Sequence, residues 1–260
     1  MGAQLNEPNR GRAVLVTGAA RGIGWAIAQR FAAAGDRVAI LDLMAGEDPE
    51  ELVAWLDGTG HVVVQADLTD GEAVLAAVDS AAAQLGGRLD ILVNNAGIFT
   101  AHPVTEVDYA TWQEQWRATL GVNLVGAANV TWCAIRHMKE QARGGRIINI
   151  SSRGAFRGEP DVPAYGASKA GLNSLTQSLA LALAPYRIAV SAVAPGFVAT
   201  DMTTDWLKPP GGDEIRAQSP FGRVAEPDEI AAAVFYLASA QAEWASGAIL
   251  DLNGASYLRS

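Results

Sequence analysis

Tyr165 and Lys169 stand four residues apart in the stretch "PAYGASKAG", at the start of a long apolar segment. On a helix this spacing places both side chains on one face, a turn apart. The pair fits an ordinary solvated helix surface. It equally fits a cation that favours the phenolate and brings the phenol's pKa, roughly 10, closer to the range of a general acid/base. The pair alone does not separate the two interpretations.

A glycine-rich turn near the other end of the chain points to a cofactor. "TGAARGIG" places Gly18, Gly22 and Gly24 between the apolar run "AVLVTG" and the helical pattern "WAIAQRFAAAG". Such a turn lets backbone N–H groups and a helix N-terminus face a pyrophosphate. Glycine triplets also occur in ordinary turns, but the position after a strand and before a helix favours dinucleotide binding.

Asp42 bears on which dinucleotide is bound. It closes the second apolar run, 24 residues after Gly18, about where a dinucleotide fold places an acid against the ribose hydroxyls. A carboxylate there repels a 2′-phosphate and favours NAD(H), whereas Arg21 in the glycine turn would attract one. We give Asp42 the greater weight, although it is also an ordinary strand-end residue, and NADP(H) stays open.

Seven short apolar runs alternate with long alanine-rich stretches. Each run is almost wholly apolar, as in strands covered on both faces, and each gap is long enough for a helix. The pattern predicts a doubly wound, seven-stranded parallel sheet in a single α/β domain over residues 13–260. Residues 1–12 are expected to be extended or disordered, and residues 202–220 to form an irregular substrate loop. The strands are expected at residues 13–18, 37–43, 61–68, 89–97, 145–152, 187–196 and 247–254.

Composition narrows the class of partner. The chain has 260 residues and a net charge of -9, which disfavours nucleic acids and anionic membranes and leaves a small molecule as the expected ligand. We expect neither a signal peptide nor a membrane span. With Cys133 as the only cysteine and no zinc-ligand spacing among His61, His102 and His137, we expect no disulfide, no metal site and a reducing, cytoplasmic setting.

Four motifs together resemble the short-chain dehydrogenase/reductase family, in its shorter single-domain branch. They are "TGAARGIG", "NNAG" at Asn94 to Gly97, Ser152 thirteen residues before "YGASK", and "PGFVATDM" at Pro195 to Met202. Their order and spacing are specific, and the similarity runs from the first strand to "LDLNG" near the C-terminus. The resemblance implies a Rossmann-type fold.

The resemblance also implies a role for each site residue. Hydride transfer to a carbonyl leaves charge on oxygen, which must be stabilised and protonated. Tyr165 would be the acid/base, Lys169 its cation and a ligand of the nicotinamide ribose, Ser152 the hydrogen-bond partner of the substrate oxygen, and Asn123 the residue that bends its helix and holds a relay water. The expected cofactor-binding residues are Gly18, Arg21, Gly22, Ile23, Gly24, Asp42, Leu43, Asp67, Leu68, Asn94, Ala96, Gly97, Tyr165, Lys169, Pro195, Gly196, Val198 and Thr200.

The leading hypothesis is therefore an NAD(H)-dependent oxidoreductase that acts on a secondary alcohol and its ketone. Phe99, His102 and Trp206 are expected to line its substrate pocket, and Trp25 to pack between helices. An alternative within the family is an NADPH-dependent 3-oxoacyl-[acyl-carrier-protein] reductase, in which Arg143 would help to dock the carrier. A non-catalytic nucleotide-binding regulator is a third reading. The family also implies a homo-oligomer, a tetramer or dimer built on helices at about 112–141 and 165–184.

Overall fold

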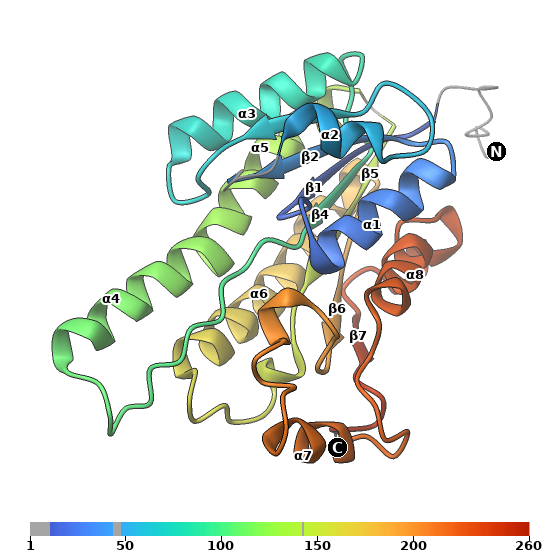
Figure 1. Ribbon diagram of the computed structural model, residues 1–260. Coiled ribbons are helices and arrows are strands. Elements are labelled where there is room, and N and C mark those ends of the chain that lie inside the picture. Colours follow the sequence, from blue (N-terminus) through green and yellow to red (C-terminus); the bar gives the residue numbers. More distant parts are fainter. Residues whose placement is uncertain (1–10, 44–47, 142, 260) are drawn as a thin grey trace.

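A computed structural model describes residues 11–43, 48–141 and 143–259, so most of the predicted N-terminal segment 1–12 lies outside the described residues. The seven predicted strands form one parallel sheet in the order β3-β2-β1-β4-β5-β6-β7 (Figure 1). The order reverses between β1 and β4, the point at which doubly wound folds bind their ligands. The strands are β1 (Ala13–Thr17), β2 (Arg37–Asp42), β3 (Val62–Gln65), β4 (Ile91–Asn94), β5 (Gly145–Ile150), β6 (Ile188–Pro195) and β7 (Ile249–Leu252).

Helices cover both faces of the sheet, as Figure 1 shows. The hydrophobic residues of α1, α2 and α8 pack on one face, and those of α3, α5 and α6 on the other. The predicted doubly wound fold is confirmed. The helices are α1 (Gly22–Ala33), α2 (Pro49–Ala54), α3 (Gly71–Gln84), α4 (Tyr109–Leu120), α5 (Ala127–Glu140), α6 (Pro163–Leu183), α7 (Gly211–Ala217) and α8 (Pro227–Leu237).

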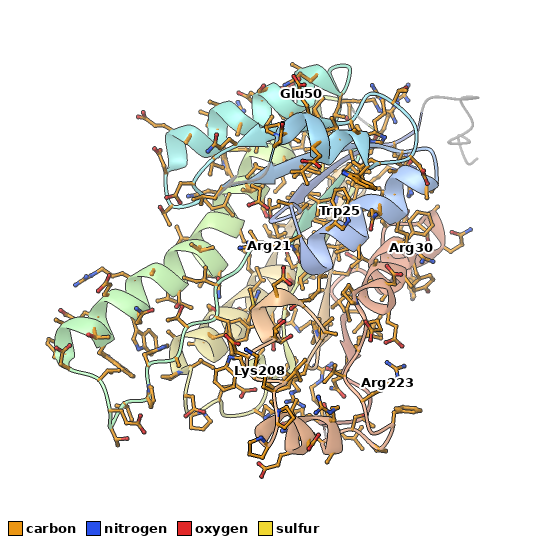
Figure 2. The ribbon with its side chains drawn as sticks, in the orientation of Figure 1. Arg21, Trp25, Arg30, Glu50, Lys208 and Arg223 are labelled. Atoms are coloured by element: carbon orange, nitrogen blue, oxygen red, sulfur yellow. The ribbon has the colours of Figure 1, made fainter. Side chains whose placement is uncertain are left out.

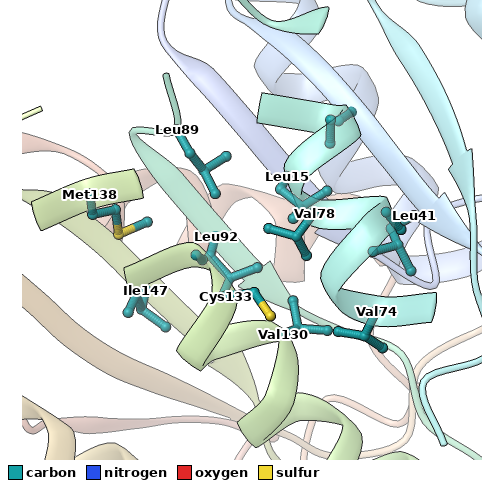
Figure 3. Packing of buried hydrophobic residues seen from close by; sticks show 14 of the residues in the cluster. Leu15, Leu41, Val74, Val78, Leu89, Leu92, Val130, Cys133, Met138 and Ile147 are labelled. Atoms are coloured by element: carbon teal, nitrogen blue, oxygen red, sulfur yellow. The ribbon is translucent and has the colours of Figure 1, made fainter. Parts of the chain in front are cut away.

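The uninterrupted apolar strands are explained by the two cores. Successive side chains of a strand point to opposite faces. In β1, Leu15 joins the core under α3 and α5 (Figure 3), whereas Val14 and Val16 join the core under α1 and α8. All three are fully buried. Strands that show no polar alternation therefore belong in the middle of this three-layer fold.

One helix is much longer than the rest. Between α4 and α5 lies a π-helical turn, Gly121–Gly126, and the three pieces run on as a 32-residue helix, Tyr109–Glu140. By length and composition alone this helix is long and apolar enough to cross a membrane. A single helix of that kind is weak evidence for a span, because core helices of soluble proteins have the same properties. Its α5 part packs against α3 and the sheet.

The segment 202–220 is more regular than its sequence predicts. It contains α7, and a 3₁₀ turn, Asp201–Thr203, precedes it. Acidic Asp213 and Glu214 lie in the first turn of α7 and Arg216 in its last, which suits the helix dipole. Arg216 also donates to the carbonyl of Leu207. The hydrophobic periodicity of the sequence does not predict this helix, because paired prolines and glycines interrupt it.

Candidate active site

A cavity of about 330 Å³ opens at the carboxyl ends of the strands, on both sides of the β1–β4 reversal. That volume is within the usual range of small-molecule sites. Of the twenty predicted catalytic and cofactor-binding residues, the four that do not line it are Gly24, Asp67, Asn94 and Asn123. The other sixteen line it: Gly18, Arg21, Gly22, Ile23, Asp42, Leu43, Leu68, Ala96, Gly97, Ser152, Tyr165, Lys169, Pro195, Gly196, Val198 and Thr200.

The glycine turn leaves the start of α1 open to a ligand. Arg21, the residue before the helix, makes no side-chain cap hydrogen bond, so the free N–H groups of the first turn face the cavity end of β1. Gly24 serves packing instead. A Cβ there would lie 2.2 Å from the carbonyl oxygen of Gly18 and 2.5 Å from Nδ2 of Asn95. The helix can approach the sheet this closely only because Gly24 has no side chain.

Asp42 lies at the end of β2 with its carboxylate held in place. Oδ2 accepts a hydrogen bond from the backbone N–H of Ala20 at 2.9 Å, and Oδ1 accepts one from Leu43 at 2.7 Å. Both bonds fix the orientation of the carboxylate. The carboxylate therefore presents a fixed negative charge to the half of the cavity next to the glycine turn.

Ser152, Tyr165 and Lys169 meet in the other half of the cavity. Ser152 follows β5, while the tyrosine and lysine lie one turn apart on α6. Lys169 is 4% exposed, and its Nζ donates to the carbonyl oxygen of Ile150 at 2.8 Å. The same Nζ lies 5.6 Å from the centre of the Tyr165 ring. The helical spacing thus places the cation below the phenol, with both groups beside the serine.

Burial governs the ionisation of this pair. Burial raises the pKa of Tyr165 to about 12; a hydrogen bond with Ser152 lowers it and the charge of Glu159 raises it. Burial lowers the pKa of Lys169 to about 8. The sequence predicts a tyrosine pKa brought down by the lysine. In the structure the protein groups alone do not do this, because the loss of hydration outweighs them.

Asn123 lies in the π-helical turn and joins two elements behind Tyr165 and Lys169. It is 1% exposed; its Oδ1 accepts from the N–H of Ile98 at 2.8 Å, and its Nδ2 donates to the Ile98 carbonyl at 3.0 Å. Nδ2 also lies 3.2 Å from Oγ of Ser168 on α6. A Cβ on Gly97 would come 3.3 Å from Oδ1 of Asn123 and 3.5 Å from Nζ of Lys169. Asn123 thus fixes the loop after β4 against α6.

The two asparagines of "NNAG" have different surroundings. Asn94 is buried and donates to Thr131 and Asn149, both at 2.8 Å, within the sheet–helix core. Asn95 lines the cavity, and its Nδ2 donates to the backbone carbonyls of Thr17 and Gly18. The structure therefore places Asn95, the neighbour of the predicted Asn94, at the cavity. Strand alternation explains the difference, because only one of two successive residues can point to a given face.

Asp67 also has a local role in the structure. Its Oδ1 accepts from the N–H and the hydroxyl of Thr69, both at 2.8 Å. These bonds form the turn that leads into α3. The adjacent Leu68 lines the cavity.

An aromatic wall stands beside Tyr165. Phe99 meets the Tyr165 ring edge-on, with centroids 4.8 Å apart, and meets Trp206 edge-on at 5.5 Å. The structure therefore brings these two predicted pocket residues to Tyr165, although neither is among the residues that line the cavity. Trp25 packs against the core under α1 and α8, as predicted.

The prediction that His102 lines the pocket is wrong. This histidine is fully buried, and its Nε2 accepts from the N–H of Ala164 at 3.2 Å while Nδ1 bonds the carbonyl of Thr100 at 2.8 Å. It caps the start of α6 and so helps to orient Tyr165.

Several cavity residues are not among the predicted site residues, although Asn95 and Asp201 lie within the motifs "NNAG" and "PGFVATDM". Most are apolar or contribute backbone. Only the parallel sheet brings them to one edge. They are Leu41, Ala66, Asn95, Ile98, Val122, Ile150, Ser151 and Asp201.

Comparison with known proteins identifies the family. A family model described as enoyl-(acyl carrier protein) reductase matches residues 18–254. The L-rhamnose 1-dehydrogenase (NAD(P)(+)) of Azotobacter vinelandii is 39% identical over 257 residues, 95% of this chain and 97% of the relative. The chain belongs to the short-chain dehydrogenase/reductase family.

Two further relatives show the breadth of the family around this chain. The cis-4-hydroxycyclohexanecarboxylate dehydrogenase of Sinomonas cyclohexanicum is 39% identical over 253 residues, 96% of this chain and 98% of the relative. A 3-ketoacyl-(acyl-carrier-protein) reductase from Brucella melitensis, solved with NADH, superposes with a TM-score of 0.86 at 34% identity, and covers 96% of this chain and 99% of that one. The protein is thus an oxidoreductase that acts on alcohol or ketone groups with a nicotinamide dinucleotide.

Proposed function

We propose that this enzyme uses NAD(H) in preference to NADP(H) to interconvert a secondary alcohol and its ketone, with Tyr165 as the general acid/base. We infer the preference for NAD(H) from the carboxylate of Asp42. Two backbone N–H groups hold it at the cavity wall. A 2′-phosphate placed beside a fixed carboxylate would meet a like charge. The uncapped start of α1 and the glycine turn fit a pyrophosphate.

The catalytic residues act on the substrate's oxygen. When bound, the nicotinamide ring supplies the hydride acceptor or donor. In the oxidation the phenolate of Tyr165 takes the hydroxyl proton and becomes the phenol, and in the reduction the phenol gives this proton to the carbonyl oxygen and becomes the phenolate. Ser152 hydrogen-bonds that oxygen, and the positive charge of Lys169 opposes the effect of burial on the phenol. Lys169 would also bind the ribose hydroxyls, and Asn123 keeps α6 and the loop after β4 in register.

Cofactor preference tests the role of Asp42 directly. With the wild type we expect kcat/KM for NAD to exceed that for NADP by about a hundredfold, the effect of a like charge at the ribose. Asp42→Asn, which keeps the shape and loses the charge, should raise kcat/KM for NADP by about tenfold. Arg21→Gln is the matched variant, because Arg21 is the residue that would attract a 2′-phosphate. It should lower kcat/KM for NADP and leave kcat/KM for NAD unchanged. A wild-type preference for NADPH would overturn the assignment.

The substrate is to be found with a panel of alcohols and ketones, each assayed with NAD(H) and NADP(H) in parallel. The aromatic wall of Phe99 and Trp206 beside Tyr165 favours substrates with a ring or alkyl group next to the reacting carbon. We expect cyclohexanols to be oxidised faster than open-chain polyols. The reverse order would contradict this use of the wall.

A thioester reductase is the second candidate, because the similarity to the Brucella melitensis 3-ketoacyl-(acyl-carrier-protein) reductase covers 96% of the chain. The same panel tests it when acetoacetyl-CoA is included with NADPH. Fast turnover of that pair alone would support the thioester reductase. Turnover of simple alcohols with NAD would support the first proposal.

We further propose that the enzyme assembles into a homo-oligomer. Trp132 on α5 is 61% exposed, Leu181 on α6 is 82% exposed and Trp244 is 97% exposed. Apolar side chains of this size on two long neighbouring helices suit contacts between copies. Analytical ultracentrifugation would show a dimer or tetramer. A monomer at micromolar concentration would contradict the proposal.

A further inference from the structure

A second cavity, of about 220 Å³, shares no lining residue with the cavity of Tyr165. Its walls come from the segments after β5 and β6, from the chain between α7 and α8, and from the segment after β7. Figure 1 shows the C-terminal segment beside α7. Ser219 joins these two parts, since its hydroxyl donates to the carbonyl of Gly254 at 2.7 Å.

Arg153 places a buried positive charge in this wall. It directly follows Ser152 and is 3% exposed. Its guanidinium donates to Oγ of Ser256 and to Oε1 of Gln218, both at 2.6 Å, and stacks on Phe197 at 5.0 Å. Both acceptors are uncharged. The other three of its five N–H donors find no acceptor among the residues that the structure describes.

Nearby charges do not neutralise Arg153. No carboxylate within the described ranges forms an ion pair with it. Burial lowers its pKa, the charge of Arg157 lowers it further, and Glu159 raises it. Arg157 and Glu159 lie 3.6 Å from each other, so they largely offset one another. A buried cation without a counter-charge is unfavourable unless an anion binds beside it.

The remaining charged residues of the cavity form a closed pair. Arg223, labelled in Figure 2 on the chain between α7 and α8, donates to both carboxylate oxygens of Glu229 at 2.7 and 2.8 Å. Among the described residues, Glu229 is the only carboxylate that lines the cavity, and this salt bridge neutralises its charge. The wall therefore keeps one net positive charge, that of Arg153.

We propose that this second cavity binds a small oxyanion, such as a carboxylate or phosphate, through the guanidinium of Arg153. A guanidinium with free N–H groups presents a fork that matches two oxygens of such an anion. Ser256, whose Oγ accepts from Arg153, adds a hydroxyl to the same wall, whereas the side chains of Ser219 and Asn253 donate to the carbonyls of Gly254 and Tyr257. Because Arg153 follows Ser152 and contacts Gln218, a bound anion neutralises a charge at the junction of the catalytic serine and the segment after α7.

Calorimetry with inorganic phosphate tests the site. Phosphate is titrated into the full-length protein saturated with NADH, which occupies the glycine turn, and sodium chloride keeps the ionic strength constant. We expect saturable binding with one phosphate per chain. Wild-type protein that shows no saturable phosphate binding overturns the proposal. Failure to bind NADH would instead contradict the proposed function, and the phosphate titration can then be run without it.

Variants assign the binding to Arg153. Arg153→Gln should weaken phosphate binding by about tenfold or more, the loss of a charge-assisted bidentate contact. Arg30→Gln changes the net charge equally on α1, a helix that contributes nothing to this cavity, and should leave binding unchanged. If Arg153→Gln does not fold, Arg153→Lys replaces it, with about threefold weaker binding expected because the fork is lost. Unchanged affinity in either Arg153 variant overturns the assignment.

Discussion

Two parts of the active-site cavity are built in contrasting ways. The proposed catalytic floor, meaning the cavity residues Ser152, Tyr165 and Lys169 together with Asn123 behind them, rests on the sheet and on α6, and hydrogen bonds tie it to residues far away in the sequence. The cover, residues 200–220, is mostly exposed and held largely by bonds between near neighbours, such as those of Thr200 with Thr203 and Thr204.

The difference separates chemistry from selectivity. A floor fixed by burial and long-range hydrogen bonds keeps the acid/base and its cation in place whatever substrate enters. A cover fixed by local contacts can change its side chains without moving the floor. Changes in the floor should therefore affect rate and stability, and changes in the cover should affect substrate binding. The four predictions below test this division in order of decreasing effect.

Tyr165→Phe should give the largest loss. The variant removes the proton donor and acceptor, so we expect kcat to fall by about a thousandfold or more, within the range for general acid/base catalysis. NADH binding, followed by fluorescence titration, should change by less than about threefold. Tyr109→Phe, at a site that is 74% exposed, is the control. Turnover within tenfold of the wild type would rule out the acid/base role.

Lys169→Met should remove a pH dependence of stability. Burial lowers the pKa of this lysine to about 8 in the folded protein, from its ordinary value of 10.5. Between these values the unfolded chain binds the proton first, so the wild type loses stability as pH falls from 10.5 to 8. The wild type should therefore gain about 3 kcal/mol relative to the variant from pH 8 to 10.5. Tyr165, whose pKa burial raises to about 12, stays protonated in both folded proteins up to pH 10.5, and without the lysine its pKa would be no lower, so its titration does not separate the two proteins.

Urea unfolding at pH 7.5, 9 and 10.5 measures that difference. If the free energies of unfolding of the wild type and the variant changed in parallel across this range, Lys169 would keep an ordinary pKa. The floor would then be more hydrated than its burial indicates.

Asn123→Ala should destabilise the protein by about 2 kcal/mol, because the N–H and carbonyl of Ile98 lose their buried partner. Asn173→Ala is a matched control. Asn173 is also buried, but its amide has no hydrogen-bond partner among the described residues, so we expect less than about 1 kcal/mol. Equal costs in denaturant unfolding would show that the hydrogen bonds of Asn123 do not hold the floor together.

Trp206→Ala tests the cover and should give the smallest effect. The variant removes the indole that packs on Phe99, so KM for a cyclic ketone should rise by about tenfold while kcat stays within about threefold. The melting temperature should move by no more than about 2 °C, since the contact is at the surface. Trp55→Ala, at a site that is 70% exposed and lines neither cavity, should change neither constant. A large drop in kcat would mean that the cover also positions the floor.

The sequence by itself determined the fold and most of the site. Seven apolar runs without polar alternation fit only strands covered on both faces, and all seven appear in the parallel sheet. The spacing of Tyr165 and Lys169 fixes them on one face of a helix because 3.6 residues make a turn. These features depend on residues that are close together in the sequence, so the periodicity of the sequence predicts them directly.

Tertiary structure decided what depends on contacts between distant segments. Asn94 and Asn95 are identical in type and adjacent, and only the orientation of β4 determines which one lines the cavity. His102 caps α6 because the loop after β4 returns to Ala164. The pKa values of Tyr165 and Lys169 follow from burial, which no spacing encodes. Arg153 is a surface residue by type, and three segments that enclose it turn it into a buried charge.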